Sequence, residues 1–377
     1  MEKQNQQIIY SADGNGPVAE RIRYAVIGSG WRSLYYARIA KALPERFQLV
    51  SLLCRTQEKA DLMKEKHQVP ATASVSECLS AEPDFVVVAV DREHIAQVSL
   101  EWLERGMPVL AETPAAIQPE DLERLRQQVK DGKKFSVAEQ YTRQAENAAR
   151  LDLIRRGVIG QPDYIYLSLA HDYHGASLMR AFLDLPAQTP FMVTAQEFSF
   201  PTTETLNRYE RFTDGRISDK KRTIGCFVFD SGAVGVYDFD SEQYRSPIRG
   251  SLIKVQGSRG ELTCNTVRWL DKDNLPHLDE IKVETRLVET DDDNPNLHSF
   301  PEVTGITWRG ESLYTPPFGL CGLSQDETAI ATMLQDMGAY VRGQAGPPYP
   351  SEEALRDALA AMMLREVVLT GAGVRCE

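Results

Sequence analysis

The sequence predicts a doubly wound α/β domain with a parallel sheet, followed by an α+β domain with a mostly antiparallel sheet. Three observations support this prediction. An apolar run at residues 24–27 is followed at once by Gly28-Ser29-Gly30, and apolar residues at helical spacing then extend to residue 43. Strand and helix patterns keep alternating as far as residue 138. The later strand runs are longer, and the Asp-Ser-Gly sequence at 230–232 is typical of a hairpin turn.

The opening segment has the order of a dinucleotide-binding unit: strand, glycine turn, helix, and a second buried strand at 48–53. Gly28 permits a tight turn, and Gly30 lets the backbone approach a pyrophosphate. The free N–H groups and the positive dipole end of the helix attract that pyrophosphate. Ser33 replaces the usual third glycine and is small enough for close packing of helix on strand. An ordinary strand–turn–helix corner is the alternative interpretation.

The rest of the first half continues this alternation. Further strands are predicted at 71–74, 85–90, 109–111 and 135–138. The helices between them are predicted at 57–66, 93–105 and 119–131. The strand at 85–90 is apolar on both faces, as a central parallel strand should be. Up to six strands therefore form one sheet, and ligands bind such sheets at the carboxyl ends of the strands.

The second half has a different pattern of predicted elements. It begins with a helix at 146–156, a strand at 164–170 and a helix at 175–183, and then has strand runs at 223–229, 234–239 and 251–255. The predicted domains are an N-terminal arm at 1–20, a dinucleotide-binding domain at 21–140 and an α+β domain at 141–377. A helix at 351–370 is expected to pack back on the body of the protein.

The central hairpin of the second half is apolar on both faces. Phe227 and Tyr237 represent one face, and Val228 and Val236 represent the other. One face packs on the helices of the domain, and a second subunit is the favoured cover for the other, in a homodimer or homotetramer. Loops folding over it from 271–315 are the alternative. The acidic segment 291–296 is interpreted as a solvated loop in preference to a calcium site.

Composition excludes several classes of function. The chain has 377 residues, 42% of them hydrophobic, and a net charge of -12, which argues against broad binding to nucleic acid or anionic membranes. No apolar run approaches the roughly 20 residues of a membrane helix, and the first 20 residues do not have the pattern of a secretory signal. The six cysteines form no C-x-x-C pair. They are expected to be free thiols in the cytoplasm, with no metal bound.

Several motifs together resemble one family. They are the sequence Ala25-Val26-Ile27-Gly28-Ser29-Gly30, His94 after the valine-rich strand, the segment 106–114 (similar to G-x-x-V-x-x-E-K-P), the turn at 156–160, and the segment 174–178. In this order and spacing the chain resembles the glucose–fructose oxidoreductase / inositol dehydrogenase / rhizopine-catabolism (Gfo/Idh/MocA) family. The resemblance implies a Rossmann domain, a second domain whose sheet often mediates oligomers, and a nicotinamide-dependent oxidoreductase acting on a sugar, polyol or related hydroxyl compound.

Two departures from the family pattern affect the chemistry. Thr113 stands in place of the lysine of E-K-P, and a threonine hydroxyl can donate a hydrogen bond but carries no charge. Ala170 stands where an aspartate is common, and the nearby polar residues are instead His171 to His174.

Hydride transfer from a hydroxyl compound requires a base for the hydroxyl proton, and histidine suits this task because its pKa lies near neutral pH. His174 is the predicted base, with His171 among the neighbours that could orient it. The predicted catalytic residues are His174, Tyr141, Asp172, Tyr173 and Thr113. The alternatives are a polar turn in which Asp172 caps the helix, packing for Tyr141, and a metal held by the two histidines, for which no third ligand has suitable spacing.

The cofactor choice is argued from the end of the second strand. Cys54 occupies the place of the acidic residue that binds a ribose 2′-hydroxyl, and Arg55 could pair with a 2′-phosphate. NADP(H) is therefore favoured over NAD(H). Glu112 could contact the ribose or fix the turn that follows it, and Arg32 could reach a phosphate or be solvated. The residues expected to bind the cofactor are Gly28, Ser29, Gly30, Trp31, Arg32, Arg55, Thr56, Val90, Asp91, His94, Glu112, Thr113 and Gln140.

The sequence leaves three functions open. The favoured one is an NAD(P)-dependent dehydrogenase or reductase for a carbohydrate-like hydroxyl or carbonyl compound. The second is a non-catalytic nucleotide-binding regulator, which the missing lysine favours. The third is an enzyme that uses transient oxidation to cleave a glycoside or eliminate a group.

Overall fold

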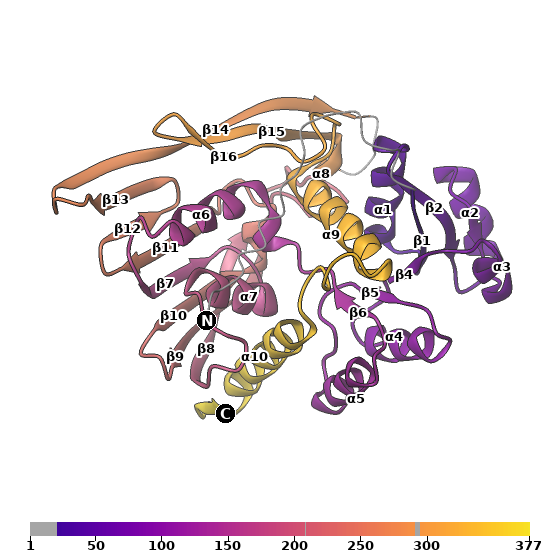
Figure 1. The fold of residues 1–377 in the computed structure, drawn as a ribbon, viewed down its shortest axis with the longest axis horizontal. Coiled ribbons are helices and arrows are strands. Elements are labelled where there is room, and N and C mark those ends of the chain that lie inside the picture. Colours follow the sequence, from indigo (N-terminus) through magenta and orange to yellow (C-terminus); the bar gives the residue numbers. More distant parts are fainter. Residues whose placement is uncertain (1–20, 208, 291–294) are drawn as a thin grey trace.

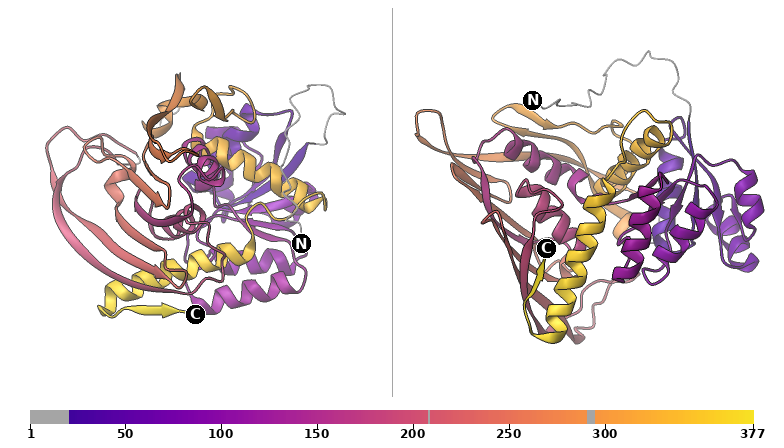
Figure 2. Two further views of the ribbon diagram at one scale, coloured as in Figure 1. Left: turned by 60° about the vertical axis from the view of Figure 1, so that its left-hand side comes forward. Right: turned by 60° about the horizontal axis from the view of Figure 1, so that its bottom comes forward.

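The structure is a computed structural model that describes residues 21–207, 209–290 and 295–377. The predicted arm at 1–20 lies outside the described residues, as do the aspartates of the acidic segment at 291–293. Two sheets dominate the fold, and they lie side by side with α9 (Gln325–Val341) and α10 (Ser351–Thr370) between them (Figures 1 and 2).

The first sheet is the predicted doubly wound sheet. Its order is β3-β2-β1-β4-β5-β6, and every pairing is parallel. Its strands are β1 (Ile22–Ile27), β2 (Phe47–Leu53), β3 (Ala71–Thr72), β4 (Phe85–Val88), β5 (Val109–Ala111) and β6 (Phe135–Val137). All four residues of β4 are buried, as the apolar run predicts. The strand order reverses between β1 and β4, which is where such sheets open a binding crevice.

The four helices predicted for the first domain are present, together with one that was not predicted. They are α1 (Trp31–Ala42), α2 (Gln57–His67), α3 (Val75–Ser80), α4 (Ile95–Glu104) and α5 (Pro119–Lys130). Of these, α4 begins two residues later than predicted, and α3 is the helix that was not predicted. The Thr56 hydroxyl caps α2 by accepting a hydrogen bond from the backbone N–H of Lys59. Pro119 occupies the first turn of α5, where its missing N–H costs nothing.

The second sheet has the order β16-β15-β14-β13-β12-β11-β7-β10-β9-β8-β17, and only the β7–β10 pairing is parallel. Its central strands are β7 (Pro162–Ser168), β8 (Phe191–Thr203), β9 (Ile217–Phe229), β10 (Val234–Asp240) and β11 (Leu252–Gly257). Its remaining strands are β12 (Gly260–Thr263), β13 (Thr266–Leu270), β14 (Pro276–Glu289), β15 (Ser299–Trp308), β16 (Glu311–Tyr314) and β17 (Val374–Cys376). The predicted α+β class is thus confirmed.

One alternative for this sheet is wrong. The segment 271–315 does not form loops over the hairpin, because β14, β15 and β16 extend the same sheet sideways (Figure 1). The two faces of the hairpin differ as predicted: Phe227 and Tyr237 are buried, whereas Val228 on the other face is 46% exposed. That outer face is therefore left without cover within the described chain.

The second half contains the remaining helices. They are η1 (Tyr141–Arg143), α6 (Ala145–Arg155), α7 (Asp172–Phe182), η2 (Ser241–Tyr244) and α8 (Pro295–His298), besides α9 and α10. As predicted, α10 packs back on the body, against α7, β8 and α5. The sequence analysis missed α9, which packs against α1 and β1 and buries Ile330 and Leu334 in the core of the first domain.

Candidate active site

A cavity of about 1380 Å³ lies between the two domains. Its walls are the carboxyl ends of the parallel strands and the first turns of three helices, α1, α7 and α9. A cavity of this size exceeds the usual volume of a small-ligand pocket and has room for a dinucleotide together with a small substrate.

Most of the predicted site residues line this cavity. The lining includes Gly28, Ser29, Gly30, Trp31, Arg32, Arg55, Val90, Asp91, His94, Glu112, Thr113, Gln140, Tyr141, His171, Asp172 and His174. Two predicted residues are not in the lining. Thr56 caps α2, and Tyr173 is 3% exposed behind His174. His94 is the N-cap residue of α4, directly before its first residue.

The glycine turn fits a dinucleotide. Gly28 has φ +119°, and a Cβ there would lie 2.2 Å from the carbonyl oxygen of Ala89, so no side chain can be accommodated. A Cβ at Gly30 would meet nothing within 4 Å, and no side chain caps the N-terminus of α1. The open approach and the free N–H groups of the first turn suit a pyrophosphate. Ser33 is fully buried, and its hydroxyl donates to the carbonyl of Gly28 at 3.0 Å.

Arg32 is held by two carboxylates. Its Nε lies 2.8 Å from Glu112 Oε1, and its Nη1 lies 2.7 Å from Asp326 Oδ2. The alternative that Arg32 is merely solvated is wrong, because its side chain is only 14% exposed. Glu112 also accepts a hydrogen bond from the Tyr36 hydroxyl at 2.6 Å. This cluster places one guanidinium group, paired with two carboxylates, in the wall of the cavity that also contains the uncharged Thr113.

Sequence reasoning missed Asp326. It lies in the first turn of α9, 294 residues from Arg32 in the chain. One local signal was available, because Ser324 and Glu327 form a capping box that marks the start of α9. Nothing in that signal points to the partner of Asp326, which depends on how α9 packs on α1.

Both ring nitrogens of His174 have protein partners. Nδ1 lies 2.7 Å from Glu139 Oε2, and Nε2 lies 2.8 Å from the Tyr173 hydroxyl. The ring also packs against that of Tyr141, with centroids 4.0 Å apart. Burial raises the pKa of Glu139 to about 8, and burial with the charge of Arg32 lowers the pKa of His174 to about 3. The two groups therefore form an uncharged buried pair at neutral pH.

Glu139 was not among the predicted site residues, although its position just after β6 was identified as a ligand-binding edge of the sheet. Its second oxygen, Oε1, accepts the backbone N–H of Tyr141 at 3.0 Å. This bond fixes the carboxyl group, so Oε2 is directed at the imidazole of His174.

His171 has the more accessible imidazole. Its side chain is 46% exposed, and its Nδ1 lies 2.5 Å from the hydroxyl of Tyr244, a residue that the sequence analysis also missed. Its Nε2 makes no hydrogen bond within the described residues, and Asp172 Oδ1 lies 4.0 Å away. The rings of His171 and His174 are 4.8 Å apart between centroids.

Asp172 is not the helix cap, because α7 begins after His171 and Asp172 lies within its first turn. Its Oδ2 pairs with Arg365 Nε at 3.2 Å. Within the described residues, no group of three histidine, cysteine or acidic side chains is arranged to hold a metal ion.

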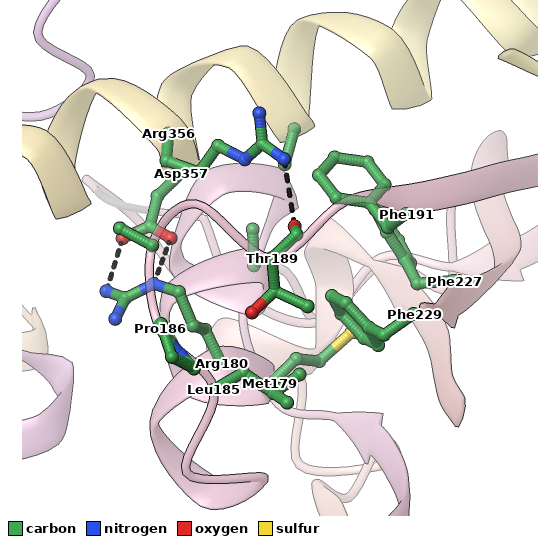
Figure 3. Close-up of a pocket in the computed structure, with 13 residues that line it drawn as sticks. Met179, Arg180, Leu185, Pro186, Thr189, Phe191, Phe227, Phe229, Arg356 and Asp357 are labelled. Carbon is green, nitrogen blue, oxygen red and sulfur yellow. Dashed lines mark hydrogen bonds and ion pairs between the residues drawn. The ribbon is translucent and has the colours of Figure 1, made fainter. Parts of the chain in front are cut away.

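A second, much smaller cavity lies between α7, α10, β8 and β9 (Figure 3). Phe191, Phe227 and Phe229 form its apolar side, and Arg356 closes it by donating to the carbonyl of Thr189 at 2.8 Å. Its volume of about 20 Å³ leaves room for about one water molecule. It is a packing gap and not a substrate site.

Comparison with protein-family models gives a match for the first domain. Residues 22–139 match the GFO_IDH_MocA model, described as an oxidoreductase family with an NAD-binding Rossmann fold. The prediction of a pyridine-nucleotide-dependent oxidoreductase agrees with this description. No curated protein matches the chain significantly. Among the described residues, no helix has the length and apolar character needed to cross a membrane.

Solved structures extend the likeness to both domains. An oxidoreductase from Agrobacterium radiobacter, in complex with NAD+, L-tartaric acid and magnesium, is 13% identical with a TM-score of 0.66, over 94% of this chain and 98% of that one. The WlbA dehydrogenase from Bordetella pertussis, in complex with NADH and UDP-GlcNAcA, is 15% identical with a TM-score of 0.61, over 95% and 99%. A probable dehydrogenase from Thermotoga maritima is 16% identical with a TM-score of 0.62, over 94% and 98%.

At these identities the solved structures show a shared fold, from the Rossmann sheet to the large antiparallel sheet. The family match itself covers the domain that carries the glycine turn. The predicted resemblance is confirmed for the first domain, whose residues 22–139 match the Gfo/Idh/MocA oxidoreductase model.

Proposed function

We propose that the protein is an NAD(P)-dependent oxidoreductase that transfers hydride to or from a sugar, a polyol or a related hydroxyl or carbonyl compound. One observation carries this proposal: a single cavity joins the glycine turn of the first domain to the two histidines of the second. The nicotinamide supplies the hydride chemistry when it is bound. The solved complexes of similar fold with L-tartaric acid and with a sugar nucleotide support a small polar substrate.

The protein must then handle the hydroxyl proton. His171 is the proposed first acceptor, because its Nε2 is in the cavity wall and free of hydrogen bonds within the described chain. In oxidation the substrate O–H bond breaks and its proton moves to His171 Nε2, while the hydride leaves the adjacent carbon. His174, the base predicted from the sequence, is not the proposed first acceptor, since Tyr173 already occupies its Nε2. It is proposed to act second, as the neighbour of His171.

The remaining wall residues have supporting roles in this proposal. Tyr141 packs on His174 and fixes the position of its ring. Asp172 anchors the first turn of α7 through Arg365. The Thr113 hydroxyl offers a hydrogen bond where the family lysine would stand, and the guanidinium group of Arg32, paired with Glu112 and Asp326, lies in the same cavity wall.

The test is a screen of sugars, polyols and sugar acids with NAD(H) and NADP(H), followed by the near-ultraviolet absorbance of the reduced nicotinamide. Net oxidation or reduction of the cofactor supports the proposal. Product without net cofactor change indicates the alternative of redox-assisted cleavage or elimination. Tight nucleotide binding without any product indicates a non-catalytic regulator, and the absence of nucleotide binding contradicts all three.

We also propose that NADP(H) is preferred over NAD(H). Cys54 is buried directly after β2, Arg55 follows it in the wall of the cavity, and neither position carries a carboxylate. A 2′-phosphate would meet no repulsion there and could pair with the guanidinium group.

The outer face of the second sheet supports a further proposal, that the protein is a homodimer or homotetramer through this face. Met192, Ile224 and Val228 are 37%, 39% and 46% exposed there. Light scattering coupled to gel filtration tests this, and a monomer at micromolar concentration contradicts it. All six cysteines are free, which supports a cytoplasmic location.

A further inference from the structure

The side-chain oxygen of Gln140 is a buried acceptor without a donor. Gln140 is 3% exposed and lines the cavity, and its Oε1 has no hydrogen-bond partner within the described residues. Its Nε2 donates to Asp326 Oδ1 at 2.9 Å. Because a carboxylate only accepts, this bond fixes the orientation of the amide and leaves Oε1 directed away from Asp326. Buried polar atoms are nearly always paired, so the site lacks a donor.

Arg32 has a hydrogen-bond donor that lacks an acceptor. Its Nε and Nη1 are bonded to Glu112 and Asp326, whereas its Nη2 makes no hydrogen bond within the described chain. Asp326 therefore holds Gln140 with one oxygen and Arg32 with the other. The unpartnered acceptor and the unpartnered donor thus belong to two side chains that are held by the two oxygens of one carboxylate.

The clamp, defined as Arg32, Asp326 and Gln140, requires Asp326 to be ionised. Burial alone would raise the pKa of Asp326, but the charge of Arg32 and the hydrogen bonds from Gln140 and Gln144 lower it below its usual value. The carboxylate thus stays charged at neutral pH, and both neighbours stay oriented.

We propose that the clamp binds a neutral ligand group that has both a hydrogen-bond donor and an acceptor, such as a carboxamide or a hydroxyl. The ligand N–H or O–H donates to Gln140 Oε1, and the ligand oxygen accepts from Arg32 Nη2. A carboxylate has no donor for Gln140, and an ammonium group has no acceptor for Arg32, so the clamp selects against both. This inference rests on the proposed function, and the ligand group belongs either to the nicotinamide or to the substrate.

The experiment measures affinity by calorimetry for three probes. NADP+ has the carboxamide, its 3-acetylpyridine analogue keeps the oxygen but replaces the N–H donor by a methyl group, and 2′-phospho-ADP-ribose lacks the ring. The variants are Gln140→Met, which removes the orphan acceptor, and Gln144→Met as the matched control. Gln144 donates to the same Asp326 oxygen at 3.4 Å but contributes no orphan atom.

The wild type should bind NADP+ about five- to tenfold more tightly than the acetylpyridine analogue. Gln140→Met should abolish this preference and Gln144→Met should keep it, while both variants bind 2′-phospho-ADP-ribose as the wild type does. That outcome assigns the clamp to the nicotinamide. If the preference survives in Gln140→Met but the KM of the best substrate from the screen rises in that variant alone, the clamp binds the substrate.

If neither quantity changes in Gln140→Met, the proposal is overturned and water satisfies the orphan oxygen. Failure of the proposed function is distinguishable, because neither ADP-ribose, measured as a further probe, nor 2′-phospho-ADP-ribose would then bind to any of the proteins. Unchanged binding of the ring-free probe by the variants also shows that they are folded.

Discussion

The two halves of the cavity are built in different ways. The cofactor half depends on one contiguous segment, Gly28 to Arg32, whose backbone conformation forms the turn and the open end of α1. The catalytic half depends on side chains that meet from distant elements, since Glu139 follows β6, His171 is the N-cap residue of α7, His174 lies within α7, and Tyr244 ends η2. The arrangement of the cofactor half is therefore set by local backbone geometry, whereas the arrangement of the catalytic half is set by the packing of distant elements.

The largest effect is expected from a substitution in the catalytic half. His171→Ala should lower kcat by about 10²- to 10⁴-fold, because the proposed proton acceptor is lost, while the nucleotide affinity remains close to that of the wild type. Steady-state kinetics and calorimetry on the same sample provide both numbers. His174→Ala is the companion variant. A large kcat loss in His174→Ala with near-normal turnover in His171→Ala would reverse the roles proposed for the two histidines.

The glycine pair tests the cofactor half. Gly28→Ala should weaken nucleotide binding by about 100-fold and lower the Tm of the apoprotein, because its Cβ would collide with the backbone of Ala89. Gly30→Ala should weaken binding as well but leave the Tm unchanged, since its Cβ meets no protein atom within 4 Å. Equal loss of Tm in both variants would mean that the turn is a structural corner and not a pyrophosphate site.

The buried Glu139–His174 pair predicts a pH dependence of stability. The pKa of Glu139 is raised from 4.5 to about 8, so the folded protein binds more protons than the unfolded chain between those values and stability falls as pH rises. The pKa of His174 is lowered from 6.5 to about 3, so its contribution rises with pH between those values. The two effects oppose each other from 4.5 to 6.5, and above 6.5 only the fall due to Glu139 remains.

The pair should therefore reduce the free energy of unfolding by about 2 kcal/mol between pH 6.5 and 8. Urea unfolding of the apoprotein at both pH values measures this change, and Glu139→Gln should remove it because an amide does not titrate. An identical pH slope in Glu139→Gln would show that other groups cause the fall.

The smallest effect is expected from a substitution of Arg55, which follows β2 in the cofactor half. Arg55→Gln should reduce the ratio of NADP(H) to NAD(H) affinity by about tenfold, because one charge-assisted contact with the 2′-phosphate is lost. Paired titrations with both nucleotides measure the ratio, and Arg92→Gln, at an exposed arginine elsewhere in the cavity wall, is the control. Clearly tighter binding of NAD(H) by the wild type would contradict the cofactor preference.

Much of the fold was predictable because its signals are short-range. The valine-rich run of β4, the glycine turn and the apolar spacing of α1 each lie within a dozen residues, and the structure has all three where they were expected. The structure of the segment 271–315 depends instead on its neighbours. The alternative that it forms loops over the hairpin is wrong, because β13 offers β14 a free edge for pairing and β14 pairs in turn with β15.

The doubly wound sheet, the glycine turn and the polar residues at the start of α7 can be predicted from short segments, because backbone sterics and hydrophobic periodicity are encoded in adjacent residues. The contacts of Asp326 with Arg32 and Gln140, of Glu139 with His174, and of Tyr244 with His171 exist only in the folded molecule. These partners lie between 35 and 294 residues apart along the chain. Their contacts arise from the packing of α9, α7 and η2 around the cavity, for which the local sequence carries no signal.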